Sequence, residues 1–378
     1  MLQAIKIRLY PNKEQTRKIN SFIGSCRVVY NECLKYKINL WETEKKSVGF
    51  NELGKYLTHN LKTNTEFKWL NEAPAQVLQQ ALIDLNTAYS NFFRNKKGYP
   101  KKKKKKDRKQ SVRFPNQSIS KNPFNDNVSK LNISKIEGLK FRCSDAYKEL
   151  LVKSEIRQIT ISRTPSGKFY ASVLINTDAK KISEPTNESI GIDLGIKTLM
   201  AFSDGTNIDN PKWLRKNEKK LKKLQRKFSK KQKGSNNSKK AALKIAKLHE
   251  KLKNQKQDFL HKQTTKIIND NQVIILEDLN VKGMLKNHRN AKAIAEISLG
   301  ELERQLKYKS EWYNRTFILI DRFYPSTQTC SNCGYVKKGK EKLHQGIRTY
   351  KCSCGHVMDR DTNAAINIQK EGLRIYNS

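Results

Sequence analysis

Two closely spaced cysteine pairs near the C-terminus constrain the fold of this chain most strongly. Two residues separate Cys330 from Cys333, one separates Cys352 from Cys354, and eighteen lie between the pairs. Zinc prefers four tetrahedral thiolates, and two close pairs joined by a loop supply them. We therefore predict a structural zinc ion, because a closed four-thiolate site leaves no position open for a reaction. The alternatives are a chance clustering and a redox pair, and the presence of two pairs disfavours the latter.

The charge of the chain indicates a polyanionic partner. Lysine and arginine number 77 against 35 aspartate and glutamate residues, which gives a net charge of +42 over 378 residues. A charge of this size repels itself unless a polyanion neutralises it, so nucleic acid is the first candidate. A membrane surface is the alternative, but the sequence shows no basic amphipathic helix with a bulky aromatic face to favour it.

Neither a signal peptide nor a membrane span is expected. Residues 1–10 alternate between apolar and polar side chains, and no run reaches the roughly 18 apolar residues that a membrane span needs. Cys26, Cys33 and Cys143 are scattered, as reduced thiols in a cytosolic protein would be. We expect a cytoplasmic protein and no membrane partner.

Strand and helix patterns alternate through the first half of the chain. Residues 1–10 have the period-2 pattern of a strand, and apolar residues recur at helical spacing over about 12–95. Short alternating runs between Ser111 and Ile175, one of them over Leu131–Ile136, predict further strands. We expect these strands and the first one to close into a small barrel into which the helices are inserted.

Polar residues in this half are candidates for nucleic-acid contacts. Gln76 and Gln80 lie four residues apart on one expected helix, and paired amides can read base edges, although ordinary solvated positions are the alternative. Ten of the fourteen residues at 96–109 are basic. Such a run is either a solvated, disordered segment or a loop along phosphates, and we favour the loop. Its central lysines are Lys101, Lys102, Lys103, Lys104, Lys105 and Lys106.

Three acidic residues in the second half follow apolar segments. Asp193 ends the expected strand 189–195, Glu277 ends the apolar run 273–279, and Asp361 precedes a helix start. If they converge, these carboxylates could bind two magnesium ions that activate water and stabilise a leaving oxygen in phosphodiester cleavage. The alternatives are a helix N-cap at Asp361 or Asp359 and a surface strand end at Glu277 and Asp278.

Four motifs in this half resemble the TnpB family, which insertion sequences encode and which is related to the type V CRISPR effectors. They are Gly191-Ile-Asp-Leu-Gly195, Leu276-Glu-Asp-Leu-Asn280, Cys330-Ser-Asn-Cys-Gly334 and Asp359-Arg-Asp-Thr-Asn-Ala-Ala-Ile-Asn-Ile368. Residues 6–11 and 91–93 also resemble the family, so the resemblance covers nearly the whole chain.

The resemblance implies an α/β fold in which a RuvC-like nuclease domain of the RNase H class joins an N-terminal wedge barrel. The nuclease domain would take up 187–324 and 356–378, with a helical hairpin at 212–270 and a zinc ribbon at 325–355 inserted. The wedge β-barrel would take up 1–10 and 110–180, and a helical recognition lobe with the lysine-rich loop would occupy 11–109.

The resemblance also implies an activity, which is RNA-guided, magnesium-dependent cleavage of double-stranded DNA beside a transposon-adjacent motif. The guide would be an RNA from the element's right end, bound by a monomer, and two magnesium ions would act in catalysis. By motif position the catalytic acids are Asp193, Glu277 and Asp361, with Asp359 as second choice. The alternatives are a nuclease-inactive nucleic-acid-binding regulator and a transposase acting in DNA transposition or recombination.

Overall fold

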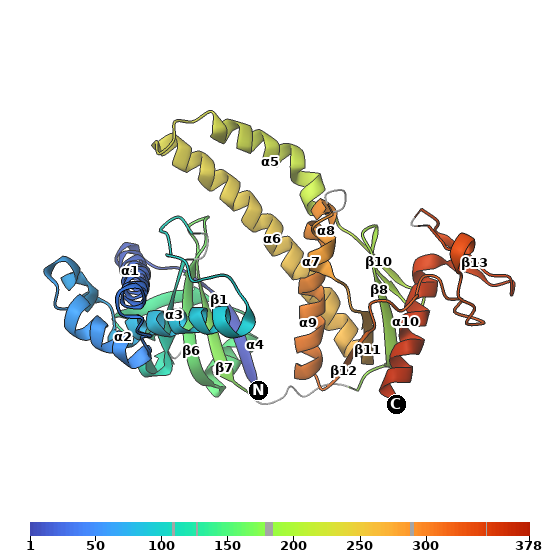
Figure 1. Cartoon of the computed structure of the whole chain (residues 1–378), viewed down its shortest axis with the longest axis horizontal. Helices are drawn as coiled ribbons and strands as arrows, with labels where there is room; N and C mark the ends of the chain where they lie inside the picture. Colours follow the sequence, from blue (N-terminus) through green and yellow to red (C-terminus); the bar gives the residue numbers. More distant parts are fainter. Residues whose placement is uncertain (108–109, 126–127, 178–183, 288–290, 345) are drawn as a thin grey trace. The chain divides into compact units, whose positions relative to one another are not determined.

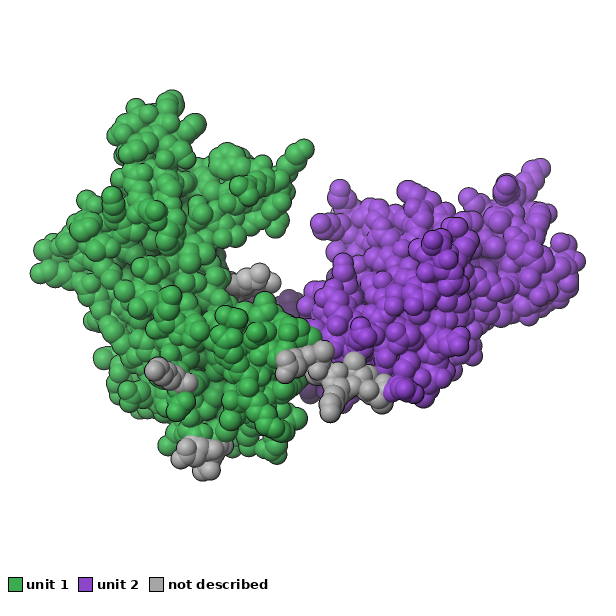
Figure 2. All heavy atoms as spheres, turned by 90° about the horizontal axis from the view of Figure 1, so that it is seen from below, with its two compact units in different colours: residues 1–178 green, residues 179–378 purple. Residues whose placement is uncertain are grey.

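The structure is a computed structural model that describes the 378 residues apart from 108–109, 126–127, 178–183, 288–290 and 345. The chain divides into two compact units, Met1–Asp178 and Ala179–Ser378, which Figure 2 shows in green and purple. Each unit has its own sheet and its own apolar core. Among the described residues, no helix combines the length and the apolar character that crossing a membrane requires.

Unit 1 is built on a seven-stranded sheet in the order β2-β6-β7-β1-β5-β4-β3. The first strand of the chain, β1, lies inside this sheet, because it pairs antiparallel with β7 along its length and with β5 at its end. The outer strands β2 and β3 are joined by the three-residue turn η3, so the sheet curves until its two edges approach each other. The bounds are β1 Leu2–Leu9, β2 Gln110–Pro115, η3 Asn116–Ser118, β3 Ile119–Phe124, β4 Lys130–Ile133, β5 Ile136–Arg142, β6 Glu155–Arg163 and β7 Phe169–Asn176.

The helices of unit 1 pack on this sheet and on each other. The long helix α1 begins at a capping box in which Asn12 and Gln15 bond each other's backbone amides, and it contacts α3. The apolar stripe of α3, with Leu78, Leu82 and Leu85, is buried in the core. The bounds are α1 Lys13–Glu44, α2 Phe50–Tyr56, η1 Leu57–Leu61, η2 Thr65–Glu72, α3 Ala75–Asn95 and α4 Asp145–Lys153.

Unit 2 contains a five-stranded sheet in the order β10-β9-β8-β11-β12. β8, β11 and β12 are parallel, whereas β9 and β10 run antiparallel to their neighbours. The carboxyl ends of the three parallel strands therefore lie at one edge of the sheet, where ligands of α/β proteins bind. The bounds are β8 Asn187–Leu194, β9 Thr198–Phe202, β10 Asn207–Asp209, β11 Asn271–Glu277 and β12 Thr316–Ile320.

Both faces of this sheet are covered by helices, which explains the continuous apolar run of β11. Ile274 and Leu276 pack with side chains of α6 (Asn236–Asp270) and α9 (Leu299–Trp312), while Ile275 packs against Ile368 of α10. Helix α10 (Arg360–Tyr376) lies close to the sheet because of a glycine: a Cβ atom at Gly191 would overlap the Ala365 carbonyl oxygen.

Two insertions extend unit 2 beyond its sheet. Helix α5 (Trp213–Ser229) runs beside α6, and Figure 1 shows the two as a long hairpin. A small ribbon with β13 (Thr349–Lys351) and β14 (Val357–Asp359) separates β12 from α10. Two short helices, α7 (Val281–Met284) and α8 (Ala291–Ile297), connect β11 to α9.

Candidate functional site

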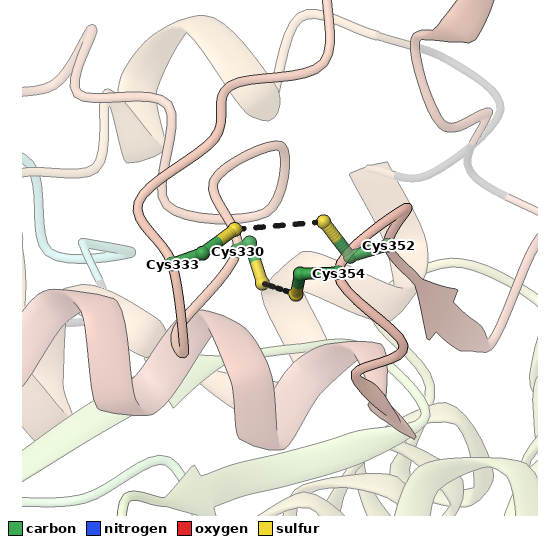
Figure 3. A group of neighbouring side chains, drawn as sticks. All are labelled: Cys330, Cys333, Cys352 and Cys354. Atoms are coloured by element: carbon green, nitrogen blue, oxygen red, sulfur yellow. Dashed lines mark hydrogen bonds between the residues drawn. The ribbon is translucent and has the colours of Figure 1, made fainter.

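The four clustered cysteines come together with the geometry of a metal site. Their sulfur atoms all lie within 4.8 Å of one another (Figure 3). The Cys330–Cys354 and Cys333–Cys352 sulfur separations are 3.8 and 3.7 Å. Zinc–sulfur bonds of about 2.3 Å at tetrahedral angles give sulfur separations of ~3.8 Å, so the cluster fits a four-thiolate ion. By contrast, burial raises the pKa of the Cys26 and Cys33 thiols to about 12, which makes these scattered cysteines unreactive.

Asp193 and Asp361 line one pocket at the carboxyl edge of the parallel strands. The pocket has a volume of about 550 Å³, and Lys197, Arg348 and Arg360 also line it. Burial, and after it the nearby Asp361 carboxylate, raise the pKa of Asp193 to about 7. Two carboxylates close together in a confined site repel each other when both are ionised, and a cation bound between them would relieve this repulsion.

Glu277 does not line this pocket, but it interacts electrostatically with Asp193. Burial, and after it the charges of Asp193 and Asp278, raise the pKa of Glu277 to about 7. Among the described residues, the group of His, Cys, Asp and Glu side chains that could share one metal ion is the four cysteines, so the structure does not bring the three carboxylates together as such a group.

Two arginines that the sequence analysis did not identify contact the Asp361 carboxylate. Arg348 Nη1 donates to Asp361 Oδ2 at 2.9 Å, and Arg360 Nη2 donates to Oδ1 at 3.1 Å. The Arg348 side chain is 43% exposed, whereas those of Arg360 and Asp361 are 14% exposed. Arg360 could have been found from its place between Asp359 and Asp361. No sequence signal marks Arg348, since the fold of the ribbon brings it here.

Asp359, the second choice for a catalytic role, caps helix α10. Its Oδ1 accepts hydrogen bonds from the backbone amides of Asp361 at 2.9 Å and Thr362 at 3.0 Å. Asp361 is in the first turn of the helix, and its carboxylate faces the arginines and the pocket. Of the two aspartates that the sequence offered as the N-cap, Asp359 is therefore the one that caps helix α10.

Gln80 and part of the lysine-rich loop meet in a second pocket, in unit 1. This pocket, of about 500 Å³, is lined by Gln80, Arg27, Lys103 and Lys104 among other residues, and Gln76 is not among them. Arg113 Nη1 donates to Gln80 Oε1 at 3.5 Å, so the Gln80 amide is already in contact with a cation.

The lysine-rich loop is attached to the helices of unit 1 at Lys103. Its amide donates to Asn31 at 2.8 Å, its carbonyl accepts from Asn31 at 3.0 Å, and its ammonium group donates to Asp84 at 3.3 Å. The other five lysines of this run are exposed, namely Lys101, Lys102, Lys104, Lys105 and Lys106. One lysine thus anchors the loop, while the rest remain accessible to a polyanion.

A second concentration of positive charge lies on helix α5, whose residues are all at least partly exposed. Basic side chains recur along it at spacings of three and four residues, so they share one face of the helix. A hollow of about 410 Å³ is lined by Lys219, Lys222, Lys223, Arg226 and Lys227 of α5 and by Lys230, which directly follows the helix.

Sequence profiles of three known domains match the chain. The profile described as "Probable transposase" matches residues 172–288, and that described as "Cas12f1-like, TNB domain" matches 300–368. A profile described as "Helix-turn-helix domain" matches residues 1–46. In the structure, this last range holds β1 and the single helix α1, so it contains no helix-turn-helix.

Full-length relatives and a solved structure agree with these matches. A *Streptomyces pristinaespiralis* protein named "Putative RNA-guided DNA endonuclease" is 37% identical over 98% of this chain and 89% of its own length. The *Escherichia coli* K12 protein "Putative RNA-guided DNA endonuclease InsQ" is 32% identical over 98% of this chain and 92% of its own. The fold matches Cas12f1, solved in complex with sgRNA and target DNA, with a TM-score of 0.56 at 12% identity over 97% of this chain and 98% of that chain.

More distant relatives, which align with 98% of this chain and 72–73% of their own length, are named TnpB-like proteins. The identity to the *Streptomyces* protein extends across both units, so it is not limited to a single shared domain. From its sequence and its fold together, the chain belongs to the TnpB family of RNA-guided DNA endonucleases.

Proposed function

We propose that this protein is a magnesium-dependent, RNA-guided endonuclease that cuts double-stranded DNA beside a short transposon-adjacent motif. The guide is an RNA from the right end of its insertion sequence. The observation that carries the proposal is the acidic site of unit 2, where Asp193 and Asp361 share a pocket and Asp193 raises the pKa of Glu277. The names of the relatives support this class of reaction.

We assign unit 2 to the RuvC-like class of the RNase H fold. The strand order supports this assignment, because three antiparallel strands are followed by two parallel ones and then by α10. The nuclease domain is assigned to 187–324 and 356–378, with the hairpin at 212–270 and the ribbon at 325–355. In unit 1 we assign the wedge barrel to 1–10 and 110–180 and the recognition lobe to 11–109.

The three carboxylates would hold two magnesium ions, which supply an activated water and stabilise the leaving oxygen. Their oxygen donors suit a hard divalent cation. Asp193 and Glu277, whose pKa values are raised to about 7, release protons when they bind a cation, since only their ionised forms are ligands.

We assign Arg348 to the phosphate of the DNA strand at this site. A guanidinium forms paired hydrogen bonds with phosphate oxygens, and Arg348 is exposed enough to turn from Asp361 toward a substrate. Arg360 is largely buried beside Asp361 and would keep that carboxylate in place.

We assign zinc to the four cysteines, where it would hold the ribbon in the conformation that presents Arg348. Strand β13 directly joins Arg348 to Cys352, and the Arg360 amide donates to the Arg348 carbonyl at 2.7 Å. A metal that fixes one end of β13 thereby restricts the position of the arginine at the other end. We expect the whole protein to act in the cytoplasm, on the nucleoid, as a monomer bound to its RNA.

The proposal is tested by copurification and by changing the guide. The protein is expressed together with the right end of its element, the bound RNA is sequenced, and its guide segment is rewritten. The proposed enzyme cuts a DNA that matches the new guide and no longer cuts the old target. Binding without cutting would identify a regulator, whereas joining of the ends to new DNA would identify a transposase.

A further inference from the structure

Phe323 has the most exposed side chain among the large apolar residues of the described part of the chain, at 86%. Single exposed apolar residues are common on protein surfaces, so exposure alone does not assign a role. A role for Phe323 is indicated instead by its position in the fold and by the hydrogen bonds that fix its turn.

Phe323 follows β12 at the edge of the sheet that holds the acidic site. Glu277, the last residue of β11, pairs in parallel register with Ile320, the last residue of β12. Phe323 comes three residues later. Because neighbouring strands lie about 4.8 Å apart, the end of β12 is one strand spacing from Glu277 and about two from β8, which carries Asp193.

The turn that carries Phe323 is fixed on both sides. The Tyr324 amide donates to the Asp321 carbonyl at 3.2 Å, and the Phe323 amide donates to Asp321 Oδ1 at 2.7 Å. Arg322 donates to the backbone carbonyl of Asp278 at 3.2 Å and also pairs with its carboxylate. Tyr324 packs inward against the cluster around Ile275. The phenyl ring of Phe323 is thus presented to solvent from a turn tied to β11.

We propose that Phe323 is a positioning residue whose ring stacks on a base of the DNA strand being cut, a role that rests on the proposed nuclease function. Stacked nucleotides rise about 3.4 Å each, and the strand end three residues before the ring is one to two strand spacings from the carboxylates, so the ring would meet a base within a few nucleotides of the cut. Aromatic stacking accepts every base. It therefore suits an enzyme whose sequence choice comes from a guide.

The test compares Phe323→Ala, Phe323→Leu and Phe323→Trp in the protein–RNA complex by single-turnover cleavage of a matched DNA. Loss of one stacked base predicts a cleavage rate about 5- to 100-fold lower for Ala. Leu should fall equally, because it is apolar but does not stack, and Trp should cleave at nearly the wild-type rate. Target affinity, measured separately, should fall by up to the same factor, because a ring that is already stacked in the bound complex also contributes to binding. Since the ring is exposed, all three variants should unfold at the wild-type temperature.

A spectroscopic readout separates stacking from other roles. With 2-aminopurine placed one to three nucleotides from the cut, in a complex inactivated by Asp193→Asn, stacking on Phe323 should quench the fluorescence, and Phe323→Ala should restore it. Wild-type rates and unchanged quenching in the Ala variant would overturn the proposal. Full activity of the Leu variant would do so too, because it would indicate packing against protein. If the wild-type complex cuts no DNA at all, the proposed function itself fails.

Discussion

Replacing Asp193 by asparagine should stabilise the metal-free protein at neutral and alkaline pH. Burial and the Asp361 charge raise the pKa of Asp193 from its ordinary value of 3.8 to about 7. A carboxyl group whose folded pKa is raised binds protons more tightly in the native state. Stability is therefore lost as the pH rises from the unfolded pKa near 4 to the folded pKa near 7. Asparagine has nearly the same shape as aspartate but no charge, so its burial does not carry the cost of an ionised carboxylate.

The size of this effect follows from the shift in pKa. Three pKa units at ~1.4 kcal/mol each give about 4 kcal/mol, and remaining solvent contact at the partly exposed side chain reduces this to about 2 kcal/mol. For a unit of 200 residues, such a gain raises the melting temperature by about 4–8 °C. Calorimetry in EDTA at pH 8 and pH 5 measures it, and the gain should be larger at pH 8.

Magnesium provides the complementary arm of this experiment. The ion should stabilise the wild-type protein at pH 8, because it neutralises the confined charges, and it should stabilise the Asp193→Asn variant much less. If the variant melts at or below the wild-type temperature in EDTA at pH 8, the assignment of a confined charge to Asp193 is wrong. A gain that does not depend on pH would point to packing instead.

Three further predictions address the fold, the ribbon and the charged surface. Gly191→Ala should destabilise unit 2 by about 2–4 kcal/mol, since its methyl group overlaps the Ala365 carbonyl, whereas Gly300→Ala, with open space around it, should not; equal melting temperatures would contradict this packing. Cys330→Ser should reduce bound zinc from one ion per chain to far less, as measured by metal analysis; an unchanged content would exclude the site. Changing Lys219, Lys223 and Lys227 to glutamine should lower the slope of log affinity for RNA against log salt by about 2, while the same change at the ion-paired Lys18, Lys153 and Lys262 should lower it less; equal slopes would remove α5 from the contacts.

Features that depend on the spacing of residues close together in the chain could be predicted from the sequence. The apolar runs that end in Asp193 and Glu277 are strands β8 and β11, because both faces of that sheet are buried. The four cysteines meet as their spacing indicated. The alternation over Leu131–Ile136 was misleading, however. Lys135 takes a left-handed conformation, with φ at 63°, and divides the run into β4 and β5.

Contacts set by tertiary structure could not be predicted. Arg348 precedes Asp361 by thirteen residues and reaches its carboxylate only because the ribbon folds back on α10. Asn31 holds Lys103 from 72 residues away, so the local charge pattern could not reveal that this lysine anchors its loop. The exposure of Phe323 likewise depends on the turn that Asp321 and Arg322 form with β11.

The most direct test of the account is the cleavage rate of the protein–RNA complex after removal of each carboxylate in turn. Asp193→Ala, Glu277→Ala and Asp361→Ala should each lower single-turnover cleavage by at least about 1,000-fold, because groups that act as a unit fail together. Target binding should remain, and the exposed Asp209→Ala should cut at the wild-type rate. If any one of the three variants keeps more than a tenth of the wild-type rate, these side chains do not form one catalytic site.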